Sequence, residues 1–223
     1  MMLSCLLISL AAVPNDPPEI DLASALARRG WVDLAEELCS RIEKMPGASA
    51  VLAEVAAAHA RQQPDTATAL REFDLAIARL GVPKTFGERA IAGFLRVEKA
   101  RRLAETPEAA KAWQAAEAFF AANLAELQKL PAGPAVEEAI LDSRLEQAKA
   151  VAARARATLG DETLRKKLLD QAVGLFLDFQ LDTGTRPIAF EAILEEGRAR
   201  GDQNDHARAE RCFRSVLALQ KNG

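Results

Sequence analysis

The two histidines have the neighbours that come closest to a metal-binding set. His206 has Asp202 four residues before it and Glu210 four residues after it. On one continuous helix, this spacing would place two carboxylates and an imidazole on one face, where a divalent metal could bind. The segment from Asp202 to Asp205 reads as a turn, however, so we interpret the cluster as helix capping. His59 has no Glu or His four residues away and is interpreted as a surface residue, so we predict no metal site and no cofactor.

No other group of residues has the spacing of a catalytic motif. The sequence has no phosphate-binding glycine loop, no Rossmann glycine cluster, no nucleophile elbow and no histidine pair at metalloprotease spacing. Adjacent carboxylates such as Glu36 and Glu37 point to different sides of a helix and cannot share a proton or a metal. A di-iron centre would need Glu-x-x-His pairs, and none is present. We predict that the protein is not an enzyme.

The three cysteines predict no disulfide framework. Cys5, Cys39 and Cys212 have neither the spacing of a redox pair nor that of a zinc site. Cys39 and Cys212 fall in apolar helical patterns, where a free cysteine behaves as a small buried hydrophobe.

The composition favours an all-helical protein that does not bind nucleic acid. Ala, Leu, Glu and Arg dominate, aromatic residues make up 5% of the chain, and Tyr is absent, which favours helix over strand. The 29 basic and 32 acidic side chains give a net charge of −3, so no overall positive field attracts a phosphate backbone. Arg101 and Arg102 form a basic cluster that we interpret as a solvated helix face.

Residues 1–13 form an uncharged apolar run of the kind found in secretory signals. Ser9 and Ala11 supply the small residues of a cleavage site, which predicts a signal peptide and an exported (periplasmic or extracellular) protein beginning near residue 12. No Lys or Arg precedes the run, so a cytoplasmic chain is the alternative. The proline-rich linker 14–19 ends the run too early for a membrane span, which needs about 20 apolar residues.

Glycine and proline divide the remaining chain into segments with apolar residues at helical spacing. The expected helices are 21–29, 31–44, 48–62, 66–80, 85–105, 107–130, 135–159, 162–181, 188–200 and 205–220. Short connections make consecutive helices antiparallel, which predicts three hairpins at 20–130 and two more at 135–220 that continue the same stack. One hairpin of this size cannot bury its own apolar stripe, so the hairpins must pack on one another.

Four of the expected second helices share a triplet of alanine, a residue at +4 that is large in three of the four, and a small or aliphatic residue at +7. The triplets are Ala35-Cys39-Ile42, Ala69-Phe73-Ala76, Ala109-Trp113-Ala116 and Ala209-Phe213-Val216. This spacing places all three side chains on one helix face, where the alanine lets a neighbouring helix approach closely. The step from Ala35 to Ala69 is 34 residues.

In these residues the chain resembles the tetratricopeptide-repeat (TPR) family, which has a 34-residue period and carries Ala, Phe and Ala at this spacing. Gly30 matches the turn glycine of the family, and Pro46 and Pro83 stand near its proline position. The resemblance covers roughly 20–130 and 186–220, and it implies a right-handed α-solenoid of about five hairpins. The first-helix signature of Trp, Leu-Gly and Tyr is absent, and the fourth hairpin has no clean match. Another helical solenoid or an irregular helical bundle is therefore the alternative.

The resemblance implies a non-catalytic scaffold that binds a peptide or a partner protein on a surface lined by first helices. Charged residues on the exposed sides of these helices are the candidate partner-binding side chains, with ordinary solubilising charge as the alternative. They are Glu54, Arg61, Arg96, Lys99, Arg102, Arg144 and Arg198. A rival interpretation is an accessory or regulatory helical module of a larger enzyme or of an envelope assembly.

The last expected helix carries apolar residues at the end of the stack. Val216, Leu217 and Leu219 lie there, and no polar capping helix follows them in the sequence. Because an apolar end face without a cap should be covered, we expect further repeats, self-association at this end, or cover by the N-terminus of the chain itself.

Overall fold

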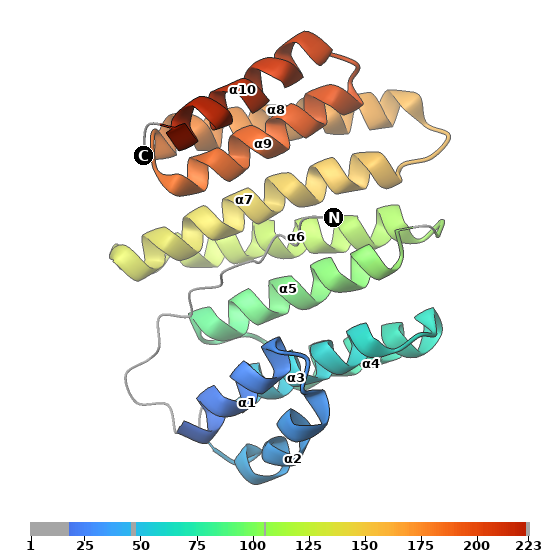
Figure 1. The fold of residues 1–223 in the computed structure, drawn as a ribbon, viewed down its shortest axis with the longest axis vertical. Helices are drawn as coiled ribbons and strands as arrows, with labels where there is room; N and C mark the ends of the chain where they lie inside the picture. Colours follow the sequence, from blue (N-terminus) through green and yellow to red (C-terminus); the bar gives the residue numbers. More distant parts are fainter. Residues whose placement is uncertain (1–17, 46–47, 105, 222–223) are drawn as a thin grey trace. The chain divides into compact units, whose positions relative to one another are not determined.

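The computed structural model describes residues 18–45, 48–104 and 106–221, and the regular structure in these ranges is entirely α-helical (Figure 1). The helices are α1 (Pro18–Arg28), α2 (Val32–Ile42), α3 (Ala48–Gln62), α4 (Thr66–Leu80), α5 (Phe86–Arg102), α6 (Ala109–Leu127), α7 (Pro134–Ala157), α8 (Glu162–Thr183), α9 (Pro187–Asp202) and α10 (His206–Lys221). Each expected helix is present, which confirms the all-α prediction. The expected signal peptide at residues 1–13, together with Cys5 and Pro46, lies outside the described residues.

Two helices begin two or more residues away from the expected start, whereas the others begin within one residue of it. Pro18 and Glu19 are assigned to a linker by the sequence but begin α1, because the fixed φ of proline suits the first turn of a helix. α6 begins at Ala109 rather than at residue 107. The Thr106 hydroxyl donates a hydrogen bond to the Leu103 carbonyl at 2.9 Å, so the residues just before Ala109 form a turn.

The chain divides into two compact units, with the boundary between Arg102 and Leu103. Unit 1 contains α1–α5 and unit 2 contains α6–α10, so the two helices of the third expected hairpin lie in different units. None of the helices in the described ranges has both the length and the apolar content that crossing a bilayer requires.

Unit 1 is a set of helices packed mainly on their sequence neighbours. α1 packs on α2, α3 packs on α4, and α5 packs on α4. The first helices also meet one another, because α3 packs against both α1 and α5. A core of buried side chains joins α1, α2 and α3, and it includes Ile20, Ala23, Ala35, Ile42 and Val55. Several of these residues are alanine, which keeps the helix axes close.

Unit 2 repeats the same arrangement with longer helices. α7 packs between α6 and α8, and α9 packs between α8 and α10. α7 and α9 also contact each other, as α3 and α5 do in unit 1. The core of unit 2 includes Leu145, Val151, Leu168, Phe176 and Phe179, which come from α7 and α8.

The alanines of the four triplets are packed as the sequence predicts. Ala35, Ala69, Ala109 and Ala209 are all buried, with at most 5% of their surface exposed. The structure adds a fifth triplet on α8, Ala172-Phe176-Phe179, which is also buried. The fourth hairpin therefore does carry the pattern, with Phe in place of a small or aliphatic residue at +7.

Side chains and glycine define the turns between helices. Asp65 accepts a hydrogen bond from the Thr68 backbone N–H at 2.7 Å and caps α4, and Asp161 caps α8 through Leu164 at 2.9 Å. Gly30 has a φ of +80°, a conformation that suits glycine between α1 and α2.

Candidate partner-binding surface

The seven predicted partner-binding residues fall into two groups, one in each unit. Unit 1 holds Glu54, Arg61, Arg96, Lys99 and Arg102, and unit 2 holds Arg144 and Arg198. The contacts of each side chain show which of them a partner could reach.

Glu54 is a link between first helices. Its carboxylate is buried and accepts hydrogen bonds from Ser24 Oγ and Arg28 Nε of α1, both at 2.7 Å. Because a buried carboxylate needs such partners, Glu54 holds α3 to α1.

Arg96 and Lys99 of α5 are also engaged within the unit. Arg96 Nη1 donates to the Ala92 carbonyl at 2.7 Å, and burial lowers the pKa of its guanidinium. Lys99 Nζ lies 2.5 Å from the Asp74 carboxylate of α4. Lys99 therefore links α5 to α4, whereas the Arg96 bond lies within α5.

Arg102 closes the end of α3. Its Nη2 donates to the Gln63 carbonyl at 2.7 Å and to the Pro64 carbonyl at 2.9 Å. Its buried Nε has no hydrogen-bond partner among the described residues. A cation at the C-terminal end of a helix is favoured by the helix dipole and by the carbonyl groups left unpaired there.

Arg61 and Arg102 meet at one hollow in unit 1. The hollow has a volume of about 220 Å³ and is lined by Arg61, Phe73, Glu98, Arg101 and Arg102. Arg101 pairs with Glu98 at 2.7 Å, and the lining of the hollow thus includes three arginines and one glutamate. We call these five residues the basic hollow.

Arg61 is the most available cation of the basic hollow. It is exposed, and its guanidinium carbon lies 5.2 Å from the centre of the Phe94 ring on α5. No carboxylate in the described part of the chain pairs with it. Stacking on an aromatic face holds the guanidinium in one orientation. Arg61 Nε donates to the Ala57 carbonyl at 3.4 Å, so its two terminal nitrogens are the donors that a partner could use.

Arg101 and Glu98 are members of this site that the prediction missed. Arg101 stands next to Arg102 in the basic cluster that the sequence suggests is a solvated helix face. Its position in the last turn of α5 is not a specific signal, because arginine also occupies the last turn of α1, α2, α3, α4, α7 and α9.

The two candidates in unit 2 are not brought together by any contact. Arg144 of α7 pairs with Asp182 of α8 at 2.7 Å and lies over the Phe179 ring at 5.8 Å. Arg198 is exposed and pairs with Glu195 of its own helix. Arg144 therefore links two helices, and Arg198 makes a local surface pair.

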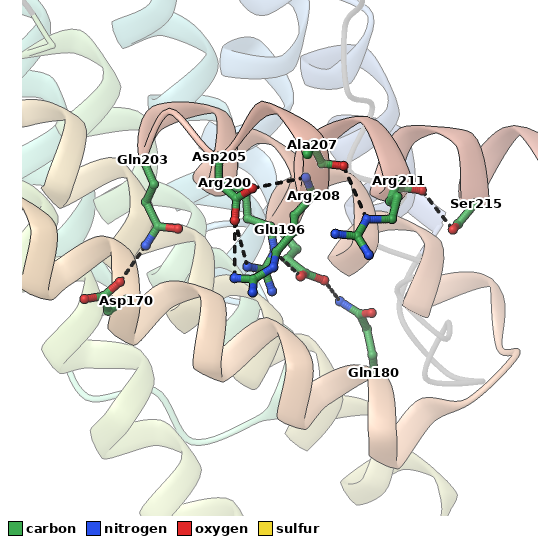
Figure 2. A network of polar contacts seen from close by, with 10 residues as sticks. All are labelled: Asp170, Gln180, Glu196, Arg200, Gln203, Asp205, Ala207, Arg208, Arg211 and Ser215. Atoms are coloured by element: carbon green, nitrogen blue, oxygen red, sulfur yellow. Dashed lines mark hydrogen bonds and ion pairs between the residues drawn. The ribbon is translucent and has the colours of Figure 1, made fainter.

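A buried ion pair on α9 organises the end of unit 2 (Figure 2). Arg200 Nε lies 2.6 Å from the Glu196 carboxylate, and both side chains are almost fully covered. Gln180 of α8 donates to the second oxygen of Glu196 at 2.9 Å. Figure 2 also shows Asp205, whose carboxylate accepts a hydrogen bond from the Arg208 backbone N–H at 3.2 Å.

This network explains the residues around His206. Asp202 ends α9 and His206 begins α10, so the metal-binding alternative requires one continuous helix that the chain does not form. Asp205 caps α10 instead, which supports the capping interpretation. No group of His, Cys, Asp or Glu in the described ranges has the geometry of a metal site.

The remaining residues in the described ranges that could take part in chemistry are two cysteines and His59, and none of them has the surroundings of a reactive group. Cys39 and Cys212 are free and half-buried, and burial, more than the neighbouring Glu36 and Glu196, raises the pKa of each thiol. A raised pKa keeps a thiol protonated and unreactive. His59 lies at the surface, with its Nδ1 at 3.3 Å from the Glu36 carboxylate.

One carboxyl group titrates near neutrality. Burial on α7, and then Glu138, Glu146 and Glu191, raises the pKa of Asp142 to about 6, while Lys149 opposes the shift. A raised pKa in the folded state means that this group favours folding at low pH, and that the contribution is lost as pH rises from about 4 through 6.

Asp142→Asn should therefore stabilise the protein at pH 7.5 and leave it nearly unchanged at pH 4. The asparagine resembles the protonated carboxyl at every pH. Because Asp142 keeps a solvent-exposed side, screening reduces the expected gain to about 1 kcal/mol at pH 7.5. Thermal unfolding at the two pH values measures the effect, and a variant that is less stable than wild type at pH 7.5 would contradict it.

Comparisons with known proteins concern the fold. No protein-family model matches the chain, and no curated protein does. Two crystal structures match over 92% of this chain and 94% of their own, with TM-scores of 0.59 and 0.58 at 20% sequence identity. Both are of a Podosopora anserina protein described as a kinesin light chain with nearly identical TPR-like repeats, and one is a point variant. The chain has the fold of TPR-like helical repeats.

Proposed function

We propose that the protein is a non-catalytic scaffold and that the basic hollow of unit 1 binds an acidic segment of a partner protein. TPR-like repeats generally serve protein–protein interaction, which supports a scaffold in broad terms. The finer proposal rests on the presence of three arginines and only one acid in the lining of a single hollow, in a protein whose net charge is −3.

The chemistry of the hollow suits carboxylates. A guanidinium presents a planar set of donors that matches both oxygens of a carboxylate, and charge-assisted hydrogen bonds of this kind are strong. Arg61 and Arg101 are exposed, so their donors can reach a bound peptide. Arg102 forms the inner wall, because it is fixed by the two carbonyl groups at the end of α3.

A fluorescein-labelled hexaglutamate peptide tests this proposal, with hexalysine as the control probe. The wild-type protein should bind the acidic peptide and show no binding to the basic peptide. Arg61→Ala and Arg101→Ala should each weaken binding about tenfold, because each removes a charge-assisted hydrogen bond worth about 1.5 kcal/mol. Fluorescence anisotropy titrations measure the dissociation constants.

Arg41→Ala is the matched control variant. Arg41 is exposed on α2 of the same unit, pairs with Glu37 and lies outside the basic hollow. Its replacement should leave the dissociation constant unchanged. Absence of binding to wild type, or an equal loss in Arg41→Ala, would refute a specific acidic-peptide site.

The rival function is an accessory module of a larger enzyme or envelope assembly. Measurements of complex formation and of turnover distinguish a scaffold from an enzyme. A scaffold should form a stoichiometric complex with a partner and show no turnover when purified alone. Turnover by the isolated protein without any added partner would favour an enzyme.

A further inference from the structure

The second helices place the middle side chain of their triplets in different environments. Phe73 on α4, Trp113 on α6 and Phe176 on α8 are at most 9% exposed, whereas Phe213 on α10 is 38% exposed. α4, α6 and α8 each pack against the helix that follows, and no helix follows α10 in the described part of the chain. The greater exposure of Phe213 thus accompanies the lack of a following helix among the described residues.

Phe213 is fixed on its other side by α9. A Cβ built on Gly197 would lie 2.7 Å from Phe213 Cε1, so the ring packs directly on the helix backbone at this glycine. Leu217 follows one turn later on the same face and is 58% exposed. Val216 is buried, and the side chain of Leu219 lies outside the described residues. We call Phe213 and Leu217 the α10 stripe.

α1 has no preceding second helix to pack against in the described ranges. α3, α5, α7 and α9 each pack against the second helix that precedes them. Leu22 of α1 is 50% exposed, and Trp31 and Leu34 of the same hairpin are exposed as well. α1 thus presents apolar surface at the end opposite in sequence to the α10 stripe.

The two surfaces carry opposite charge. On α10, Arg208, Arg211 and Arg214 are exposed, and Glu210 is the only acid of the helix. The α1–α2 hairpin (residues 18–45) carries six exposed acids and four exposed basic residues, so it is net acidic. The acids are Glu19, Asp21, Asp33, Glu36, Glu37 and Glu43, and the basic residues are Arg28, Arg29, Arg41 and Lys44. Complementary charge around apolar contacts favours pairing of these two surfaces over pairing of either with itself.

We propose that α10 of one copy packs against α1 of a second copy, head to tail, as α4 packs against α5. Each copy then supplies a neighbour that α1 and α10 do not have among the described residues, and the α10 stripe and Leu22 become buried. Because two different surfaces meet, the contact is heterologous, and the assembly grows with concentration unless it closes into a ring. This assembly is independent of the basic hollow, which lies on α3–α5.

Sedimentation velocity of the full chain over a range of concentrations tests the contact. The weight-average mass of wild type should rise above that of one chain as concentration increases. Leu217→Glu and Leu22→Lys should each weaken association about tenfold or more, because each places a charge opposite a surface of the same sign in an apolar contact. Leu181→Glu, which changes an 82% exposed residue of α8, is the matched control and should associate like wild type.

A mixing experiment separates this arrangement from symmetric pairing. The Leu217→Glu chain keeps an intact α1 surface, and the Leu22→Lys chain keeps an intact α10 stripe. Mixed in equal amounts, the two variants should form a 1:1 complex, although each alone is largely monomeric. Far-UV circular dichroism of each variant confirms that it is folded.

Three outcomes would overturn the proposal. One is a wild-type chain that remains monomeric at every concentration. A second is association that Leu22→Lys does not weaken, which would indicate pairing of α10 with α10. The third is association that appears only after residues 1–17 are removed, which would assign cover of the α10 stripe to that segment of the chain itself.

Discussion

Phe176→Ala is expected to lower the free energy of unfolding by about 4 kcal/mol. The ring is fully buried on α8, within the core that includes Leu168 and Val173. The substitution removes the transfer free energy of the ring and leaves a cavity, because α7 and α9 hold α8 from two sides and limit its collapse. Urea unfolding followed by tryptophan fluorescence measures the loss, in a Trp31→Phe background where Trp113 of unit 2 is the one remaining tryptophan.

Leu181→Ala is the control for this substitution. Leu181 lies on the same helix and is 82% exposed, so its truncation should change the free energy of unfolding by no more than about 0.5 kcal/mol. Similar losses in the two variants would show that the face of α8 bearing Phe176 is not the packed one.

The positions of the helices could be predicted because residues close in sequence determine where each helix begins and ends. Gly30 adopts the positive φ that ends α1, and Asp65 caps α4 with its side chain. Such signals involve residues close in sequence, so they can be recognised without knowing the fold. The alanine triplets are similar, since one helix face is fixed by spacing alone.

The division into two units could not be predicted from the same signals. The connection between α5 and α6 contains Thr106 and Pro107, which resemble the residues of other turns between paired helices. Whether two successive helices pack together depends on the shapes of their contacting faces. The spacing of residues in the sequence identifies a face but does not identify the helix that packs against it. The triplet on α8 was missed for a related reason: α7 and α8 are longer than the family's helices, so the 34-residue step fails there.

The candidate site was predicted only in part. A side chain that would be exposed on an isolated helix can be covered by another helix in the folded protein. Glu54 lies on the side of α3 that meets α1, and Arg144 lies on the side of α7 that meets α8. Both side chains are held by partners from distant parts of the sequence. Arg61 and Arg102 instead meet at the hollow, and only the packing of α3 against α5 reveals that they share it with Arg101.

Ala69→Leu is expected to lower the free energy of unfolding by about 2 kcal/mol, because extra carbon atoms must enter a packed contact. Ala69 is fully buried on α4, which packs against both α3 and α5. The leucine would separate the helices or force strained rotamers. The loss arises from excess volume, whereas the loss in Phe176→Ala arises from missing volume, so the two substitutions test the packing from opposite directions.

Small alanines at the triplet positions let neighbouring helices pack closely together. The most direct test compares the free energy of unfolding of Ala69→Leu with that of Ala67→Leu on the same helix. Ala67 is exposed, so its substitution should change the free energy of unfolding by no more than about 0.5 kcal/mol. Urea unfolding followed by far-UV circular dichroism should therefore show a large loss for Ala69→Leu alone. Equal stability of the two variants would contradict the packing on which the repeat fold rests.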